Sequence, residues 1–100
     1  MITYLVVCAE VSENDRDAFD RWYAEEHLSD AKAAFGAVRA FRGWSDDSAH
    51  LAFYECTALA AARAAIKSDA LTALIAEVDR VWQGHIVRTR RIVDIVQVLD

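Results

Sequence analysis

The order of its apolar segments constrains this chain more than any other feature. Four short apolar runs, the first and the last rich in β-branched residues, are combined with two longer segments of helical periodicity. The pattern predicts strands at residues 2–9, 38–44, 50–57 and 86–99, and helices at residues 13–35 and 58–82. Gly36 and Gly84 are placed to end the two helices. No linker or repeat interrupts the 100 residues, so we predict one domain, residues 1–100.

The predicted order is strand–helix–strand–strand–helix–strand. Short connections and right-handed crossovers then place the strands in the order 4-1-3-2, antiparallel, with both helices on one face of the sheet. This arrangement is the ferredoxin-like βαββαβ sandwich of the α+β class. Ser68 and Asp69 favour helix starts over helix interiors, so the second helix is expected to break near them.

The strands predict that the other face of the sheet is covered as well. A sheet with one wet face alternates apolar and polar residues. Here residues 5–8 and 51–54 are continuously apolar, and apolar pairs occur at 92–93, 95–96 and 98–99. The hydrophobic fraction of 55% exceeds the usual value of about 45–50%. With only two helices available, a second sheet is the simplest cover. We therefore predict a homodimer packed sheet on sheet, a dimeric α/β barrel.

The charge balance limits the partners. The formal net charge is −5, which argues against binding of nucleic acid through a basic face. The one basic cluster is Arg88, Arg90 and Arg91, interpreted as a solvated or salt-bridged strand edge. The N-terminal apolar run ends at Glu10 and lacks a basic flank, so neither a signal peptide nor a membrane span is expected.

The cysteines and histidines indicate no metal or redox site. Cys8 and Cys56 lack C-x-x-C spacing, and a cytoplasmic setting follows by default. His50 and His85 stand at strand starts, where we expect exposed side chains. Scattered histidines without helical pairing do not make a metal site, so we expect neither a metal nor a cofactor.

The first helix carries the best candidate for chemistry. Tyr23 and His27 are four residues apart and share its apolar face. Asp30 lies three residues after His27 and could hold its imidazole in one tautomer, as an orienting acid does for a general base. The candidate catalytic residues are therefore His27 and Asp30. The alternative interpretation is that His27 is a packed polar residue without a reaction.

Aromatic residues and one arginine are candidates for substrate binding. Arg39 and Arg42 point to opposite faces of the second strand, so only one can face the helices. There it could bind a carboxylate or enolate oxygen, or it could form a surface ion pair instead. Core packing is an equal alternative for the aromatic members of the set. The candidate substrate-binding residues are Trp22, Tyr23, Arg42, Trp44, Tyr54 and Trp82.

About a quarter of the chain carries a family resemblance. The run Phe19-x-x-Trp22-Tyr23-x-x-Glu26-His27-Leu28-x-Asp30, followed by Phe35-Gly36-x-x-Arg39-Ala40-x-Arg42, resembles the signature of EthD-like proteins of the dimeric α/β-barrel superfamily. Ser29 and Phe35 stand where relatives often carry proline. The resemblance implies a face-to-face dimer with a pocket between helices and sheet in each protomer, and it places His27 at a plausible catalytic position.

The resemblance implies a small-molecule enzyme without cofactor. An isomerase, lyase or monooxygenase acting on a small aromatic or lactone-like substrate is expected, with His27 as general acid or base. Two alternatives stay open: a non-catalytic small-molecule binding or accessory protein of the same fold, and an interaction platform without a ligand. One fold hosts many functions, so the fold alone does not choose among them.

Overall fold

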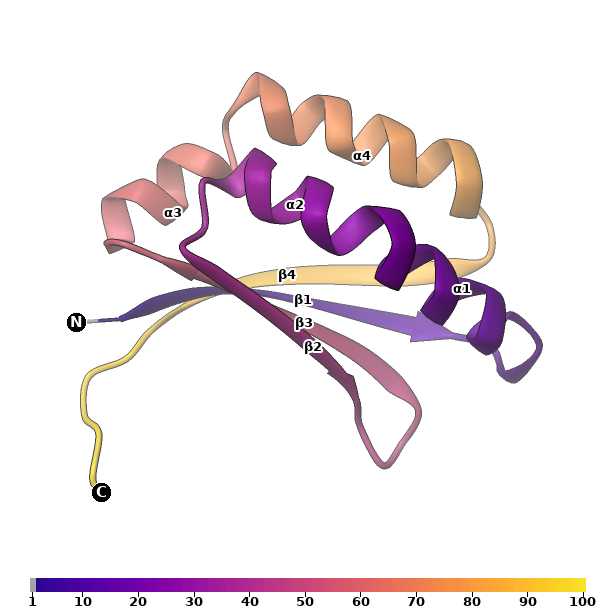
Figure 1. Ribbon diagram of the computed structural model, residues 1–100, viewed down its shortest axis with the longest axis horizontal. Helices are drawn as coiled ribbons and strands as arrows, with labels where there is room; N and C mark the ends of the chain where they lie inside the picture. Colours follow the sequence, from indigo (N-terminus) through magenta and orange to yellow (C-terminus); the bar gives the residue numbers. More distant parts are fainter. Residues whose placement is uncertain (1) are drawn as a thin grey trace.

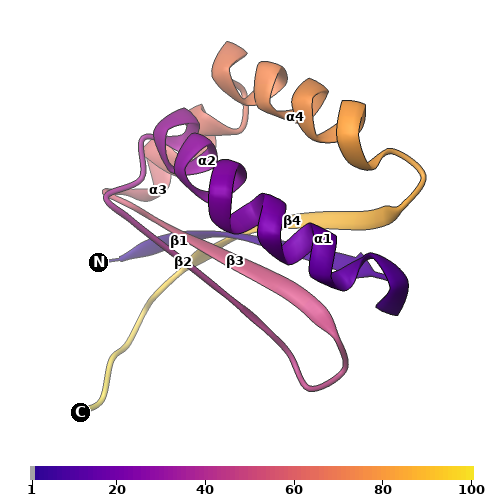
Figure 2. The same cartoon turned by 45° about the vertical axis from the view of Figure 1, so that its right-hand side comes forward.

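The structure is a computed structural model and describes residues 2–100. Its four strands form one antiparallel sheet in the order β2-β3-β1-β4, which is the predicted order. All helices lie on one side of this sheet (Figures 1 and 2). The predicted ferredoxin-like α+β fold is therefore confirmed. The strands are β1 (Thr3–Val11), β2 (Arg39–Trp44), β3 (Ala49–Cys56) and β4 (Ile86–Asp94).

The first helical segment is continuous but changes its winding. It begins with a 3₁₀ turn, η1 (Glu13–Asp15), and continues as α1 (Arg16–Trp22). A π-helical turn, η2 (Tyr23–His27), joins α1 to α2 (Leu28–Phe35). Gly36, with φ 62° and ψ 30°, ends the helix in the left-handed region, as predicted. The π turn was not predicted, and such turns often occur at functional sites.

The second helical segment breaks where the sequence predicts. Its parts are α3 (Leu59–Ala65) and α4 (Asp69–Trp82). The hydroxyl of Ser68 accepts a hydrogen bond from the backbone N–H of Leu71 at 3.1 Å and so caps α4. Leu71, Val78 and Trp82 are buried on one stripe of α4, which packs against α2.

The core lies between the helices and the sheet. Alternate residues of β1 and β3 are buried under the helices, and the intervening residues are mostly half-buried on the opposite side. The buried apolar side chains form one cluster: Leu5, Val7, Ala9, Val11, Phe19, Tyr23, Ala31, Phe35, Ala37, Ala52, Tyr54, Cys56, Ala62, Ala65, Leu71, Val78 and Trp82.

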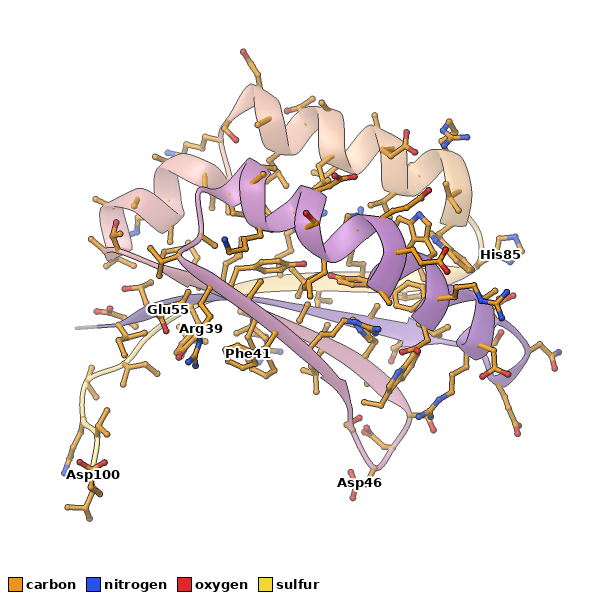
Figure 3. All side chains as sticks on the ribbon, viewed as in Figure 1. Arg39, Phe41, Asp46, Glu55, His85 and Asp100 are labelled. Atoms are coloured by element: carbon orange, nitrogen blue, oxygen red, sulfur yellow. The ribbon has the colours of Figure 1, made fainter. Side chains whose placement is uncertain are left out.

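The opposite side of the sheet is apolar and lacks a helix; we call it the open face. Arg39 and Phe41 of β2 lie on this side (Figure 3). Phe41 stacks on Phe53 with ring centroids 5.1 Å apart, and Tyr4 meets both rings edge-on. A hollow of about 430 Å³ crosses the middle of the face, lined by Val6, Cys8, Leu51, Phe53, Thr89, Arg91 and Val93.

The fourth strand is shorter than predicted. It ends at Asp94, which pairs with Thr3 near the start of β1, and not at Leu99. One further backbone bond joins the N–H of Ile95 to the carbonyl of Ile2 at 2.9 Å. Beyond it no strand is available for pairing, so residues 96–100 leave the sheet (Figure 1). The apolar pair at 98–99 is thus exposed and does not belong to a strand face.

Candidate functional site

The π turn places His27 under the helices. His27 is buried, and its ring stacks on Trp22 with centroids 4.5 Å apart and an interplanar angle of 15°. The ring of Tyr23 lies edge-on at 4.7 Å. His27 forms no hydrogen bond with the described residues. Although the residue is buried, its ring nitrogens are not completely shielded from solvent.

Two small cavities adjoin His27. The space that the centre of a water molecule can occupy is about 10 Å³ in one cavity and about 20 Å³ in the other. Each cavity therefore holds about one water. A third cavity, of about 240 Å³ by the same measure, lies between α4 and β4. Val78 and Arg88 line all three spaces, so the three cavities are neighbours.

The predicted solvated or salt-bridged strand edge is confirmed for Arg91 and Arg88: β4 is an edge strand, Arg91 is exposed, and Arg88 forms an ion pair with Asp79 at 3.6 Å. Arg90 differs, because it is half-buried and has no ion pair among the described residues. Both Arg88 and Arg90 face the helices, in line with Ile86 and Ile92. The period-two alternation of a strand decides this, because residues 86, 88, 90 and 92 share one face. Arg91 alone of the cluster lies on the open face. A positively charged wall therefore bounds the cavities beside His27.

Arg42 is the arginine of β2 that faces the helices, but its guanidinium binds Asp20 of α1 and not a cavity. Its Nη1 donates to Asp20 Oδ1 at 2.8 Å, and its Nη2 donates to the Asp20 carbonyl at 3.2 Å. The indole N–H of Trp44 donates to the same carboxylate oxygen at 2.9 Å. Arg42 and Trp44 thus anchor α1 to β2, and neither lines the three cavities.

His50 is buried, in contrast to the exposed position predicted from the sequence. Its side chain points from β3 toward the helices, and Nε2 lies 3.2 Å from Arg42 Nη1. Because a guanidinium only donates, His50 Nε2 accepts, and the histidine is neutral with its proton on Nδ1. His50 also lines one of the small cavities beside His27. His85 is exposed, as predicted (Figure 3).

Two tyrosine hydroxyls supply the remaining buried polarity. Tyr23 and Tyr54 share a hydrogen bond of 2.7 Å between their hydroxyl oxygens. Burial raises the pKa of Tyr23 to about 12 and raises that of Tyr54 further. Both hydroxyls therefore stay protonated near neutral pH. Tyr54 lines one of the small cavities and Tyr23 the other.

The site keeps both buried histidines uncharged. Burial, with the charge of Arg88 as the next cause, lowers the pKa of His27 to about 4. Burial and the charge of Arg42 lower the pKa of His50 to about 4. A neutral imidazole can accept a proton, which is the requirement for a general base.

The six candidate binding residues and Asp30 separate into two groups. Trp22, Tyr23, Tyr54 and Trp82 line the cavities, whereas Arg42 and Trp44 do not. Asp30 is exposed on α2 and forms no hydrogen bond or ion pair with His27 among the described residues. The placement gives no support to an orienting role for Asp30.

Within residues 2–100, no three histidine, cysteine or acidic side chains gather where they could hold a metal ion. None of the helices there is both long and apolar enough to cross a membrane.

The fold and site define a ferredoxin-like α+β protein with a buried histidine beside arginine-lined cavities. No protein-family model and no curated protein matches the sequence. The fold is similar to that of an ethyl tert-butyl ether D (EthD) family protein from Bacillus halodurans, with TM-score 0.73 and 16% identity. That match covers 96% of this chain and 100% of the other. The resemblance seen in the sequence is thus supported at the level of the fold.

Two other solved structures are similar. HapK from Hahella chejuensis matches with TM-score 0.69 and 13% identity, covering 100% of this chain and 97% of that one. SnoaB from Streptomyces nogalater, described as a cofactor-independent oxygenase, matches with TM-score 0.65 and 16% identity, over 98% of this chain and 96% of the other.

Proposed function

We propose that this chain is an EthD-like small-molecule enzyme that works without a cofactor. The reaction would be of isomerase, lyase or monooxygenase type on a small aromatic or lactone-like substrate, with His27 as general acid or base. One observation carries the proposal: His27 is buried and neutral, has no hydrogen-bond partner among the described residues, and lines two cavities between helices and sheet. Similarity in fold to a cofactor-independent oxygenase supports it.

The chemistry begins with a proton. The neutral imidazole of His27 would take a proton from carbon next to a substrate carbonyl, giving an enolate and an imidazolium. Return of the same proton to another carbon completes an isomerisation. Expulsion of a leaving group from the enolate completes a lyase reaction. Reaction of the electron-rich enolate with dioxygen is the first step of an oxygenase without cofactor.

Exchange of substrate hydrogen for deuterium tests the proton step. Enolisable aromatic ketones and lactones are incubated in D₂O with the protein, and loss of the α-hydrogen signal is followed by NMR. His27→Gln should slow the exchange about 100-fold or more, because a positioned base contributes about that much. His85→Gln is the matched control, since His85 is exposed. Equal exchange in wild type and His27→Gln, with a substrate that exchanges above the solvent rate, would contradict a catalytic His27.

The alternative function is a non-catalytic binding or accessory protein of the same fold. One observation favours it: the spaces beside His27 hold about one water each, and the larger cavity lies beyond them between α4 and β4. His27 would then only hydrogen-bond to a ligand. In that case His27→Gln weakens binding, and no compound exchanges its α-hydrogen faster than in solvent.

We also propose that two copies pair through their open faces. Phe41 is 38% and Val93 is 40% exposed on a face that carries apolar residues from all four strands, and large apolar patches mark interaction sites. This arrangement leaves the cavities on the helix side free for a ligand in each copy.

Cys8 and Cys56 are free thiols, which agrees with the reducing, cytoplasmic setting proposed for the protein.

A further inference from the structure

The helix side of β4 holds two like charges in succession. Arg88 and Arg90 are two residues apart, so their Cα atoms are about 6.6 Å apart on one face of an edge strand. Both are half-buried. Such neighbours repel each other in a site with little water, and an arrangement of this kind is stabilised by an anion.

The protein itself supplies little of that negative charge. Asp79 of α4 lies 3.6 Å from Arg88 Nη2, and its side chain is 53% exposed. Among the described residues, Arg90 has no ion pair and no side-chain hydrogen bond. Burial and the charge of Arg88 lower the pKa of Arg90. One positive charge therefore remains unbalanced at this wall.

The cavity of about 240 Å³ between α4 and β4 has a charged wall and an apolar wall. Arg88 and Arg90 form the first wall. Val78, Trp82 and Ile86 contribute the apolar surface, and Asp79, Gln83 and Gly84 complete the lining. The indole N–H of Trp82 is sealed from solvent and has no acceptor among the described residues. Since that nitrogen is sealed, the indole offers the cavity its apolar ring surface and not its N–H.

We propose that Arg88 and Arg90 bind the carboxylate of a small organic acid whose apolar body packs against Trp82. Two arginines and one aspartate line the cavity, giving a net charge of +1, which suits a monoanion. A guanidinium fork matches the two oxygens of a carboxylate. This inference deepens the proposed function and rests on it for the statement that the bound acid is a substrate.

The position of the anion also fits the proposed proton step. Arg88 lines both the ligand cavity and the small cavities beside His27. An acid held at its carboxylate would thus extend its other end toward the imidazole. The bound anion would also offset the positive charges of Arg88 and Arg90, both of which lower the pKa of His27. Binding the acid would therefore make His27 a stronger base.

Calorimetric titration with benzoate tests the inference. Wild-type protein should bind benzoate, and benzamide, which has the same shape without the charge, should bind at least about tenfold more weakly. Arg90→Met should lose about tenfold or more in affinity for benzoate, since a charge-assisted hydrogen bond contributes about 1.5–3 kcal/mol. Arg91→Met is the matched control: it removes the next arginine of β4, on the opposite face, and should bind benzoate as the wild type does.

Three results would overturn the inference. They are equal affinity for benzoate and benzamide, equal loss in Arg90→Met and Arg91→Met, and tighter binding of inorganic phosphate than of benzoate, which would assign the site to an inorganic anion. If Arg90→Met fails to fold, Arg90→Lys and the indole N–H NMR signal of Trp82 in wild-type protein replace it. Benzoate should shift that signal, identified through Trp82→Phe, and benzamide should not; the same shift with both ligands would contradict the proposal.

His27→Gln separates this inference from the proposed function. This variant should keep its benzoate affinity, because His27 lies outside the cavity between α4 and β4. Arginine-dependent benzoate binding with no loss of proton exchange in His27→Gln would reject the catalytic histidine and leave the acid site standing. Loss of exchange in His27→Gln, together with benzoate binding that does not depend on Arg90, would support the catalytic histidine and reject the acid site.

Discussion

Tyr23 of the π turn and Tyr54 of β3 share one hydrogen bond, 2.7 Å between hydroxyl oxygens, in the core between helix and sheet. Either hydroxyl can be the donor. Each hydroxyl is the other's only side-chain hydrogen-bond partner among the described residues. The bond therefore couples the helix turn that holds His27 to the central sheet.

Removing both of these hydroxyls should cost less stability than the sum of the two single removals. Tyr54→Phe leaves the Tyr23 hydroxyl buried without its partner and should lower the free energy of unfolding by about 1–3 kcal/mol. The double variant Tyr23→Phe, Tyr54→Phe should lose less than the sum of the two single variants. Urea denaturation of the four proteins measures the coupling. Strict additivity would show that the hydroxyls do not interact.

The buried histidines predict acid sensitivity in a defined pH window. Folded His27 and His50 have pKa values of about 4, below the unfolded value of about 6.5. Between these values the unfolded chain binds more protons, so stability falls as pH decreases from 6.5 to 4 and is unaffected above 6.5. The loss is up to about 3 kcal/mol for each histidine. Arg88, Arg90 and Arg42 contribute to this shift and stay charged throughout the window.

Urea denaturation at pH 7.5, 6 and 5 measures this dependence. His50→Gln should flatten the slope between pH 6.5 and 4 by about half, because one of the two titrating groups is gone. Asp20, whose pKa is lowered by its hydrogen bonds from Trp44 and Arg42, affects stability only below about pH 4. A wild-type free energy of unfolding that is equal at pH 7.5 and 5 would refute the burial of neutral histidines.

Asp20 should contribute to the attachment of α1 to β2. Asp20→Ala removes the carboxylate that accepts from Arg42 and from Trp44. The expected loss is about 1 kcal/mol, since the side chain of Asp20 is 48% exposed and water screens the ion pair. Asp17→Ala, an exposed residue of the same helix, is the control and should change stability by less than about 0.5 kcal/mol. Equal effects of the two substitutions would deny Asp20 this role.

A charge on the open face should prevent pairing of two copies. Phe53→Asp places a carboxylate in the middle of the apolar hollow, where burial against a second sheet would leave it unpaired. Light scattering after size exclusion at micromolar concentration should give a dimer for the wild type and a monomer for this variant. Val81→Asp on α4, which is exposed on the helix side, should stay dimeric. A wild-type monomer would contradict the proposed homodimer.

The sequence by itself determined the fold, because periodicity and chain breaks act locally. Short apolar runs identified the strands, Gly36 ended the first helix, and Ser68 divided the second. Connection rules then left one order for the sheet. The period-two repeat of a strand also predicts the inward position of Arg88 and Arg90. Ile86 lies two residues before Arg88 and Ile92 two residues after Arg90, so all four share one face of β4. Reading the three arginines as one charge cluster missed this signal.

Only the tertiary structure decided what surrounds each candidate side chain. Residues 98–99 have strand character, but β1 offers no partner beyond Thr3, so β4 stops at Asp94. His50 is buried because β3 is covered by the helix that carries Phe19 and Tyr23. His27 lines two cavities under the helices, whereas Asp30, three residues on, is exposed. These outcomes depend on contacts between segments far apart in the chain, which no local pattern in the sequence contains.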